Sequence, residues 1–149
     1  MSPLHGTTPL PFPPSVDPRE HRRGERFELP AVAASVADAR SRVARRADRW
    51  GLPDTVRDTA QLIISELFTN ALLHTDSHIV ICRLESAGHR LRLEVADEGP
   101  GLARLFPRAP SSEAEHGRGL MLLDALAARW GVISPENGRG CTVWAEVRP

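Results

Sequence analysis

The sequence predicts a two-layer α/β sandwich of the α+β type, in which a mixed, mostly antiparallel sheet carries three helices on one face. Apolar residues recur at steps of three and four in three segments, which indicates amphipathic helices. They alternate with polar residues in two pairs of shorter segments, which indicates hairpins. A chain of 149 residues is long enough for one domain with a core and too short for two of ordinary size.

The N-terminal part of this order is a flexible arm followed by a strand and a helix. Residues 1–25 are rich in proline and end in a charged run, so we expect an arm there and a folded domain over residues 26–149. A short strand is expected at residues 26–29, ended by Pro30. Val32–Trp50 has the helical period, and Gly51 stops that helix.

The central helix carries polar groups on a single face. Asp54 is the expected N-cap of this helix, and the helix is expected to end near residues 75–76. Glu66, Asn70 and His74 interrupt an apolar run at four-residue steps, so their side chains lie one turn apart. Burying such groups unpaired costs about 1–3 kcal/mol for a neutral group and more for a charge. The face is therefore expected to form the floor of a site.

The C-terminal half supplies two hairpins and a third helix. Residues 78–84 and 90–96 read as one hairpin, and residues 132–134 and 142–147 as another. Between them we expect a mobile lid at residues 102–116 and a helix that runs to Trp130 and is closed by Gly131. A Gly-x-Gly sequence opens that helix and frees backbone N–H groups for an anion.

The amino-acid composition excludes several classes of partner and of catalytic residue. The 19 basic and 19 acidic residues cancel, so we expect neither direct nucleic-acid binding nor an electrostatic membrane anchor. All 19 basic residues are arginine, which excludes a catalytic lysine and a P-loop lysine. Cys82 and Cys141 fit no metal or redox spacing and are predicted to be free, buried thiols. Without an apolar run of signal-peptide or membrane-span length, the expected location is the cytoplasm.

Four short motifs, weak singly, are specific in this order. They resemble the N, G1, G2 and G3 boxes of the GHKL (Bergerat-fold) ATPase/kinase superfamily: Glu66-x-x-x-Asn70, Asp97-x-Gly99-x-Gly101, Gly117-x-Gly119-Leu120 and Gly140-x-Thr142. The Ser-Glu-Leu-x-x-Asn-Ala-x-x-His sequence at residues 65–74 is similar to that of the anti-sigma-factor serine kinases of the RsbW and SpoIIAB type. The resemblance covers residues 26–147 and implies a Bergerat-fold, HATPase-type ATP-binding domain.

The resemblance also implies a role for each motif residue. Asn70 would be the Mg²⁺ ligand, and Asp97 would accept a hydrogen bond from the adenine amino group. Glu66 would be the catalytic general base. The remaining nucleotide-binding positions are the turn glycines, the phosphate-binding helix start and the third-box threonine, namely Gly99, Gly101, Gly117, Arg118, Gly119, Leu120 and Thr142. Arg118 or Arg104 would offset charge on the transferring group.

Two functions follow from the resemblance. The first is an ATP- and Mg²⁺-dependent anti-sigma factor and protein serine/threonine kinase, which phosphorylates a STAS-type anti-sigma-factor antagonist and binds a sigma factor. The alternative is an ATP-binding regulatory module that docks a partner without phosphoryl transfer. Glu66 favours the first, because only that function needs its carboxylate. A homodimer through the Val32–Trp50 helix is a further expectation.

Two readings of His74 compete with a role at the nucleotide. A histidine at the C-terminal end of a helix is favoured by the helix dipole, and we prefer this explanation to catalysis. His74, Asp76 and His78 also suggest zinc, but the sequence supplies no fourth ligand nearby.

Overall fold

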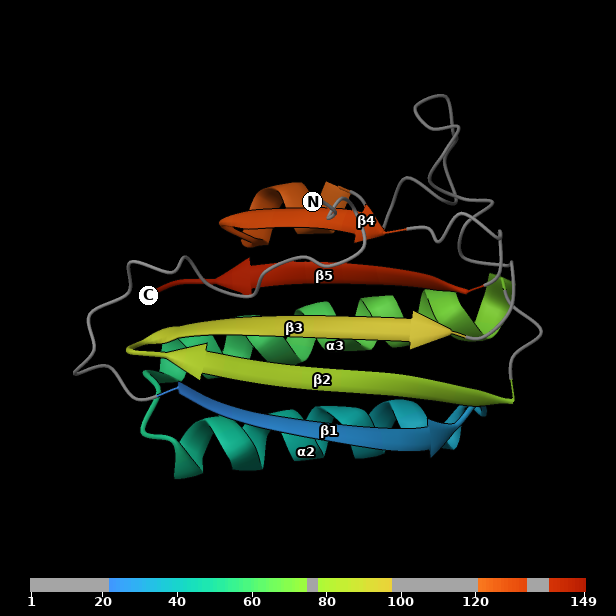
Figure 1. Ribbon diagram of the computed structural model, residues 1–149, viewed down its shortest axis with the longest axis horizontal. Coiled ribbons are helices and arrows are strands. Elements are labelled where there is room, and N and C mark those ends of the chain that lie inside the picture. Colours follow the sequence, from blue (N-terminus) through green and yellow to red (C-terminus); the bar gives the residue numbers. More distant parts are fainter. Residues whose placement is uncertain (1–21, 75–77, 98–120, 134–139) are drawn as a thin grey trace, which may run out of the picture.

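The computed structural model describes residues 22–74, 78–97, 121–133 and 140–149. Five strands form one sheet in the order β1-β2-β3-β5-β4, and every described pairing is antiparallel (Figure 1). The strands are β1 (Arg22–Pro30), β2 (Ile79–Ala87), β3 (Arg90–Asp97), β4 (Arg129–Ile133) and β5 (Cys141–Val147). The predicted two-layer class is confirmed.

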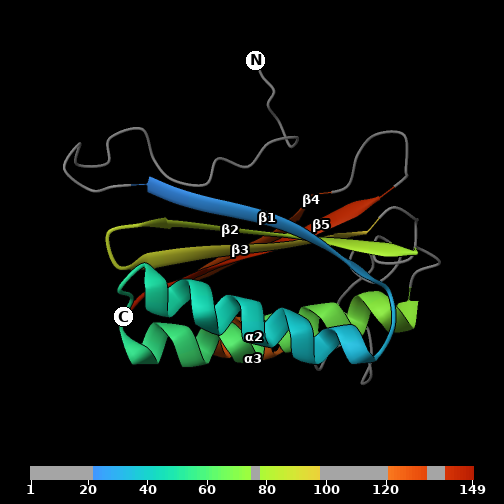
Figure 2. The same ribbon diagram turned by 90° about the horizontal axis from the view of Figure 1, so that it is seen from below.

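Two long helices, α2 (Ala34–Arg49) and α3 (Asp54–His74), cover one face of this sheet (Figure 2). Residues 121–126 form a third, shorter helical segment, and its Leu123 is fully buried in the same core. The sheet contributes alternate residues of its strands to that core, for example Leu91, Leu93 and Val95 of β3. Because strand side chains alternate between faces, these odd-numbered positions of β3 all point toward the helices.

Helix α2 ends as its sequence predicts. Gly51 has φ +73°, a left-handed conformation that glycine adopts without steric cost. The N–H of Gly51 donates to the Asp48 carbonyl at 3.1 Å, and the N–H of Leu52 donates to the Ala47 carbonyl at 2.9 Å. These two bonds are those of a Schellman motif, which turns the chain back so that α3 packs antiparallel beside α2.

The start of α3 differs by one residue from the prediction. The N–H groups of Val56 and Arg57 both donate to the carbonyl of Pro53, each at 3.0 Å, so Pro53 occupies the cap position. Asp54, predicted as the N-cap, is instead the first helical residue. There its carboxylate faces the positive end of the helix dipole and pairs with Arg57 at 3.3 Å.

Strand β1 begins at Arg22, four residues before the predicted strand and inside the segment expected to be the arm. It pairs with β2 along its whole length, from Arg22 opposite Ala87 to Pro30 opposite Ile79. Its first residues are charged and exposed, as suits a strand at the edge of a sheet. Without apolar alternation, that stretch gave no strand signal in the sequence.

The hairpin of β2 and β3 is tighter than predicted. Both strands continue to Ala87 and Arg90, which leaves a turn of only Gly88 and His89. Gly88 has φ +62°, as the first position of a type II′ turn requires.

The predicted boundary between the third helix and the following strand was wrong. Trp130 and Gly131 belong to β4, where they pair with Ala145 and Trp144 of β5. Gly131 is not a helix stop: a Cβ atom on it would lie 2.7 Å from the indole nitrogen of Trp144. The glycine is needed because the Trp144 ring lies against the β4 backbone, a contact that periodicity cannot reveal.

Neither Cys82 nor Cys141 is in a disulfide and both are buried, as predicted. Within the described residues, no helix has both the length and the apolar character needed to cross a membrane.

Candidate functional site

Helix α3 presents Glu66 and Asn70 on its accessible side. The opposite side is fully buried, with Ile64 and Phe68 at 0% exposure, while Glu66 and Asn70 are half-buried. Their four-residue spacing puts the carboxylate and the amide one turn apart. Packing of the apolar side therefore fixes the helix so that two oxygen-bearing groups remain within reach of a ligand.

Asp97 is the last residue of β3, and its carboxylate is buried at 5% exposure. It pairs with Val80 on one side and with Cys141 on the other, both buried. Asp97 continues the helix-facing series of Leu93 and Val95. A carboxylate kept in such a position is uncommon, because burial disfavours its charge, and it marks a candidate functional group.

Gly140 brings the start of β5 against Asp97. Its φ is +82°, and a Cβ atom would lie 3.1 Å from the Asp97 backbone oxygen. Any other residue would be strained twice, by its left-handed backbone and by this close approach. The position thus requires glycine for a reason visible in the structure, independent of the box motif.

These residues gather at one end of the molecule. Helix α3 packs on β3 and β5. Both ribbon views place the carboxyl end of α3 at the same end as the carboxyl end of β3 (Figures 1 and 2). The half of α3 that carries Glu66 and Asn70 therefore lies on the side of the molecule where β3 ends in Asp97.

Thr142 does not share this face. It pairs with Ala96 of β3 and Ile133 of β4, one register position away from Asp97. Directly paired residues point to the same face of a sheet, so Cys141 lies on the face of Asp97 and Thr142 on the helix-free face. The register therefore counts against the prediction for Thr142. The alternation of buried residues along β5, followed back from Ala145 and Val143, would have predicted from the sequence that Cys141 lies on the helix-facing side.

The other predicted positions lie outside the described residues. These are the turn glycines, the lid and the start of the phosphate-binding helix, namely Gly99, Gly101, Arg104, Gly117, Arg118, Gly119 and Leu120. Asp76 of the zinc set also lies there. Among the described residues, no three His, Cys, Asp or Glu side chains are grouped so that they could hold a metal ion.

The polar side chains described at the site carry oxygen ligand atoms of hard character, in a carboxylate and an amide on α3 and a second carboxylate on β3, and the Cys141 thiol lies on the same face as Asp97. The oxygen groups suit hydrogen bonding to a polar ligand, proton transfer and contact with a cation such as Mg²⁺.

Residues 29–146 match the model of the histidine kinase-like ATPase domain family, and the chain belongs to this family. Membership of an ATPase-domain family implies that the chain binds ATP. The matched region includes both long helices and the strands β2, β3 and β4 in full. It also includes Glu66, Asn70 and Asp97.

A solved structure shares the fold, namely that of the RsbU and RsbW domains of Rv1364c from Mycobacterium tuberculosis. It aligns with a TM-score of 0.62 and 19% sequence identity, over 85% of this chain and 32% of that one. The chain thus spans about a third of the length of that protein chain. No curated protein matches the sequence.

Proposed function

We propose that this protein is an ATP-dependent serine/threonine kinase of the anti-sigma-factor type, with its nucleotide site between α3 and the carboxyl end of β3. The observation that carries the proposal is the buried Asp97 carboxylate beside Gly140. A carboxylate accepts a hydrogen bond from the adenine amino group, whereas guanine presents an acceptor at the same position. Asp97 would therefore select ATP over GTP.

Mg²⁺ fits the donors on α3. Asn70 offers a neutral amide oxygen on the accessible side of the helix, and magnesium prefers oxygen ligands while keeping several waters and phosphate oxygens. Asn70 would hold the ion without adding charge that repels phosphates. When bound, the ion would neutralise charge on the phosphates.

Glu66 is the proposed general base. Its carboxylate lies one turn before Asn70, half-buried, so that it can accept the proton of an attacking serine or threonine hydroxyl. The hydroxyl oxygen forms a bond to the γ-phosphorus as the bond from that phosphorus to the bridging oxygen of ADP breaks. Gly99, Gly101 and the backbone around residues 117–120 would hold the nucleotide and its phosphates.

The proposed phosphate acceptor is an anti-sigma-factor antagonist of the STAS type, and the proposed second partner is a sigma factor. The support is the motif order in this chain together with the fold shared with a protein whose solved structure contains RsbU and RsbW domains. The cytoplasm is the proposed location of this system.

The test is incubation of the pure protein with labelled Mg-ATP and purified antagonists, comparing wild type with Glu66→Gln. Loss of a general base typically lowers the rate by about 10²–10⁴-fold. Phosphate transfer should fall by that order, while ATP binding and sigma-factor binding persist. A variant that phosphorylates at the wild-type rate would remove Glu66 from the mechanism. A wild type that binds Mg-ATP and its antagonist but transfers no phosphate would establish the docking module instead.

A further inference from the structure

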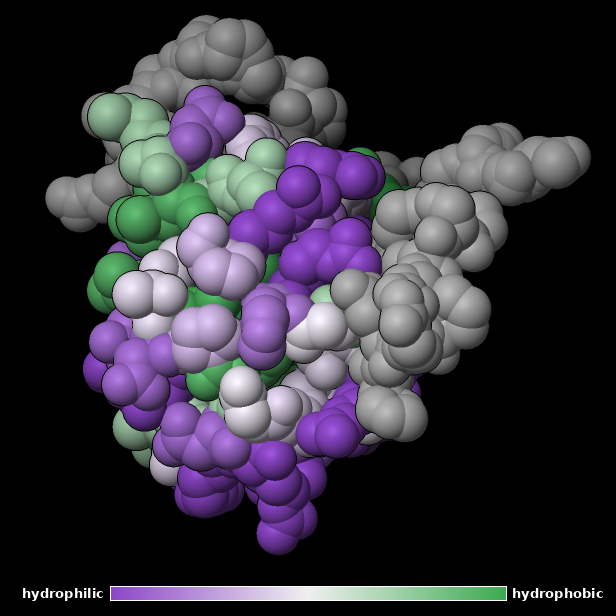
Figure 3. All heavy atoms as spheres, turned by 90° about the vertical axis from the view of Figure 1, so that its left-hand side faces the viewer, coloured by the Kyte–Doolittle hydropathy of each residue, from purple (hydrophilic) through white to green (hydrophobic). Residues whose placement is uncertain are grey.

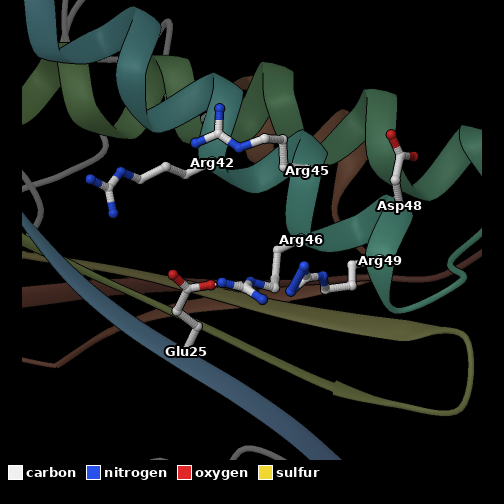
Figure 4. Close-up of a pocket in the computed structure, with 6 residues that line it drawn as sticks. All are labelled: Glu25, Arg42, Arg45, Arg46, Asp48 and Arg49. Carbon is white, nitrogen blue, oxygen red and sulfur yellow. Dashed lines mark hydrogen bonds and ion pairs between the residues drawn. The ribbon is translucent and has the colours of Figure 1, made fainter.

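A groove lies away from the proposed nucleotide site, between α2 and β1. The groove encloses about 480 Å³ and is lined by Glu25 of β1 and by five residues of α2, namely Arg42, Arg45, Arg46, Asp48 and Arg49 (Figure 4). In both ribbon views the carboxyl end of α2 lies at the end of the molecule opposite to the carboxyl end of β3 (Figures 1 and 2). The groove is therefore separate from the face that carries Asp97.

The four arginines form one stripe. Their positions follow the i, i+3, i+4, i+7 spacing, so they lie on a single side of α2 over about 10 Å. Arg45 and Arg49 are exposed. Figure 3 shows hydrophilic residues gathered at the lower end of this side of the molecule, where β1 and α2 lie.

Among the described residues, one of these four arginines has a carboxylate partner. Arg46 pairs with Glu25, and Arg42 lies over the Phe27 ring at 4.9 Å. Arg45 donates a hydrogen bond to the Ser41 hydroxyl at 3.1 Å. In the described part of the chain, Arg42, Arg45 and Arg49 form no ion pair with a carboxylate. Four arginines and two carboxylates give the groove a net charge of about +2 in a chain whose net charge is zero.

We infer that this groove docks an acidic segment of a partner protein, whose carboxylates are spaced like the arginines of α2. The planar guanidinium fork matches a carboxylate and can bind it through two hydrogen bonds. Glu25 and Asp48 line the same groove, and they would repel the continuous phosphates of a nucleic acid.

The probe for this surface is a fluorescein-labelled, alanine-based peptide of about 14 residues with four glutamates at the i, i+3, i+4, i+7 spacing. Its binding to the full chain is followed by fluorescence anisotropy at low salt and compared with that of the glutamine version. The variant Arg45→Glu/Arg49→Glu should bind the glutamate peptide at least about tenfold more weakly, because two attractions become repulsions. A lysine version of the peptide should bind this variant better than it binds wild type.

The matched control is Arg40→Glu/Arg83→Glu, which makes the same charge change at two exposed arginines outside the groove. It should retain binding within about twofold. Because all four side chains are exposed, both variants should unfold at the wild-type temperature, and Arg49→Gln provides a milder substitution.

Three results would overturn the inference. Equal losses in the two double variants would attribute binding to overall charge. Equal binding of the glutamate and glutamine peptides by wild type would remove the arginines from recognition. Tighter, groove-dependent binding of a single-stranded oligonucleotide of the same length would identify the surface as one for nucleic acid.

Discussion

At the scale of single residues, two groups buried on the helix-facing side of the sheet, Asp97 and Cys82, have different explanations. Asp97 is a charged residue at 5% exposure in a series of otherwise apolar core positions. Gly140 leaves room for the backbone oxygen of Asp97, which a Cβ atom at position 140 would crowd. Cys82 is also fully buried, but it lies between apolar neighbours in mid-strand and behaves as a small hydrophobic residue. Burial raises the pKa of the Cys82 thiol from its ordinary value of 9.0 to about 12, against a smaller opposing influence of Arg42.

The Cys82 pKa predicts an alkaline loss of stability. Below pH 9 the thiol is protonated in both states, whereas between pH 9 and about 12 only the unfolded state gives up its proton. The free energy of unfolding should therefore fall as pH rises, by up to about 1.4 kcal/mol per pH unit. Urea unfolding of wild type and Cys82→Ala from pH 8 to pH 11 measures this slope.

The chain contains neither lysine nor tyrosine to titrate in that range, and the second thiol, Cys141, is controlled for by repeating the comparison in a Cys141→Ser background. Cys82→Ala lowers stability at every pH by removing buried atoms, but it should flatten the alkaline slope. An unchanged slope in the variant would show that another group controls the loss.

At the scale of elements, apolar periodicity predicted which elements form, and three-dimensional contacts decided where they begin and end. The helix over Val32–Trp50 and the hairpin pairs were recognised from their own sequences. Residues 22–25 were assigned to the arm because pairing with β2, and not local pattern, makes them a strand. Trp130 and Gly131 were assigned to a helix because nothing local signals the contact of Gly131 with Trp144.

The turn between α2 and α3 depends on the left-handed backbone of Gly51. Nothing lies within 4 Å of a Cβ atom placed on Gly51, so only its φ of +73° opposes a larger residue. Gly51→Ala should lower the free energy of unfolding by about 1 kcal/mol. Gly51→Asn should cost less, because asparagine tolerates the left-handed region. The two variants are compared by urea unfolding, and equal stability of Gly51→Ala and wild type would contradict this account of the turn.

At the scale of the whole molecule, the two-layer architecture separates two chemically different surfaces. One end carries Glu66 and Asn70 on α3 and Asp97 on β3, and the other carries the arginine groove between α2 and β1. The sequence predicted the residues of the first through motif order, and Glu66 and Asn70 could be paired because they lie four residues apart on one helix. It did not reveal the groove, since Glu25 and the arginines of α2 belong to different elements.

A nucleotide site that selects adenine through Asp97 can be tested by titration calorimetry with ATP and GTP. Wild type should bind ATP and show no comparable binding of GTP. Asp97→Asn should lose ATP affinity by at least about tenfold, because an amide cannot reproduce the acceptor pattern of the carboxylate. Asp38→Asn, the same change at an exposed position on α2, should bind as wild type does. Equal ATP affinity of wild type and a folded Asp97→Asn, or tight GTP binding by wild type, would contradict the assignment.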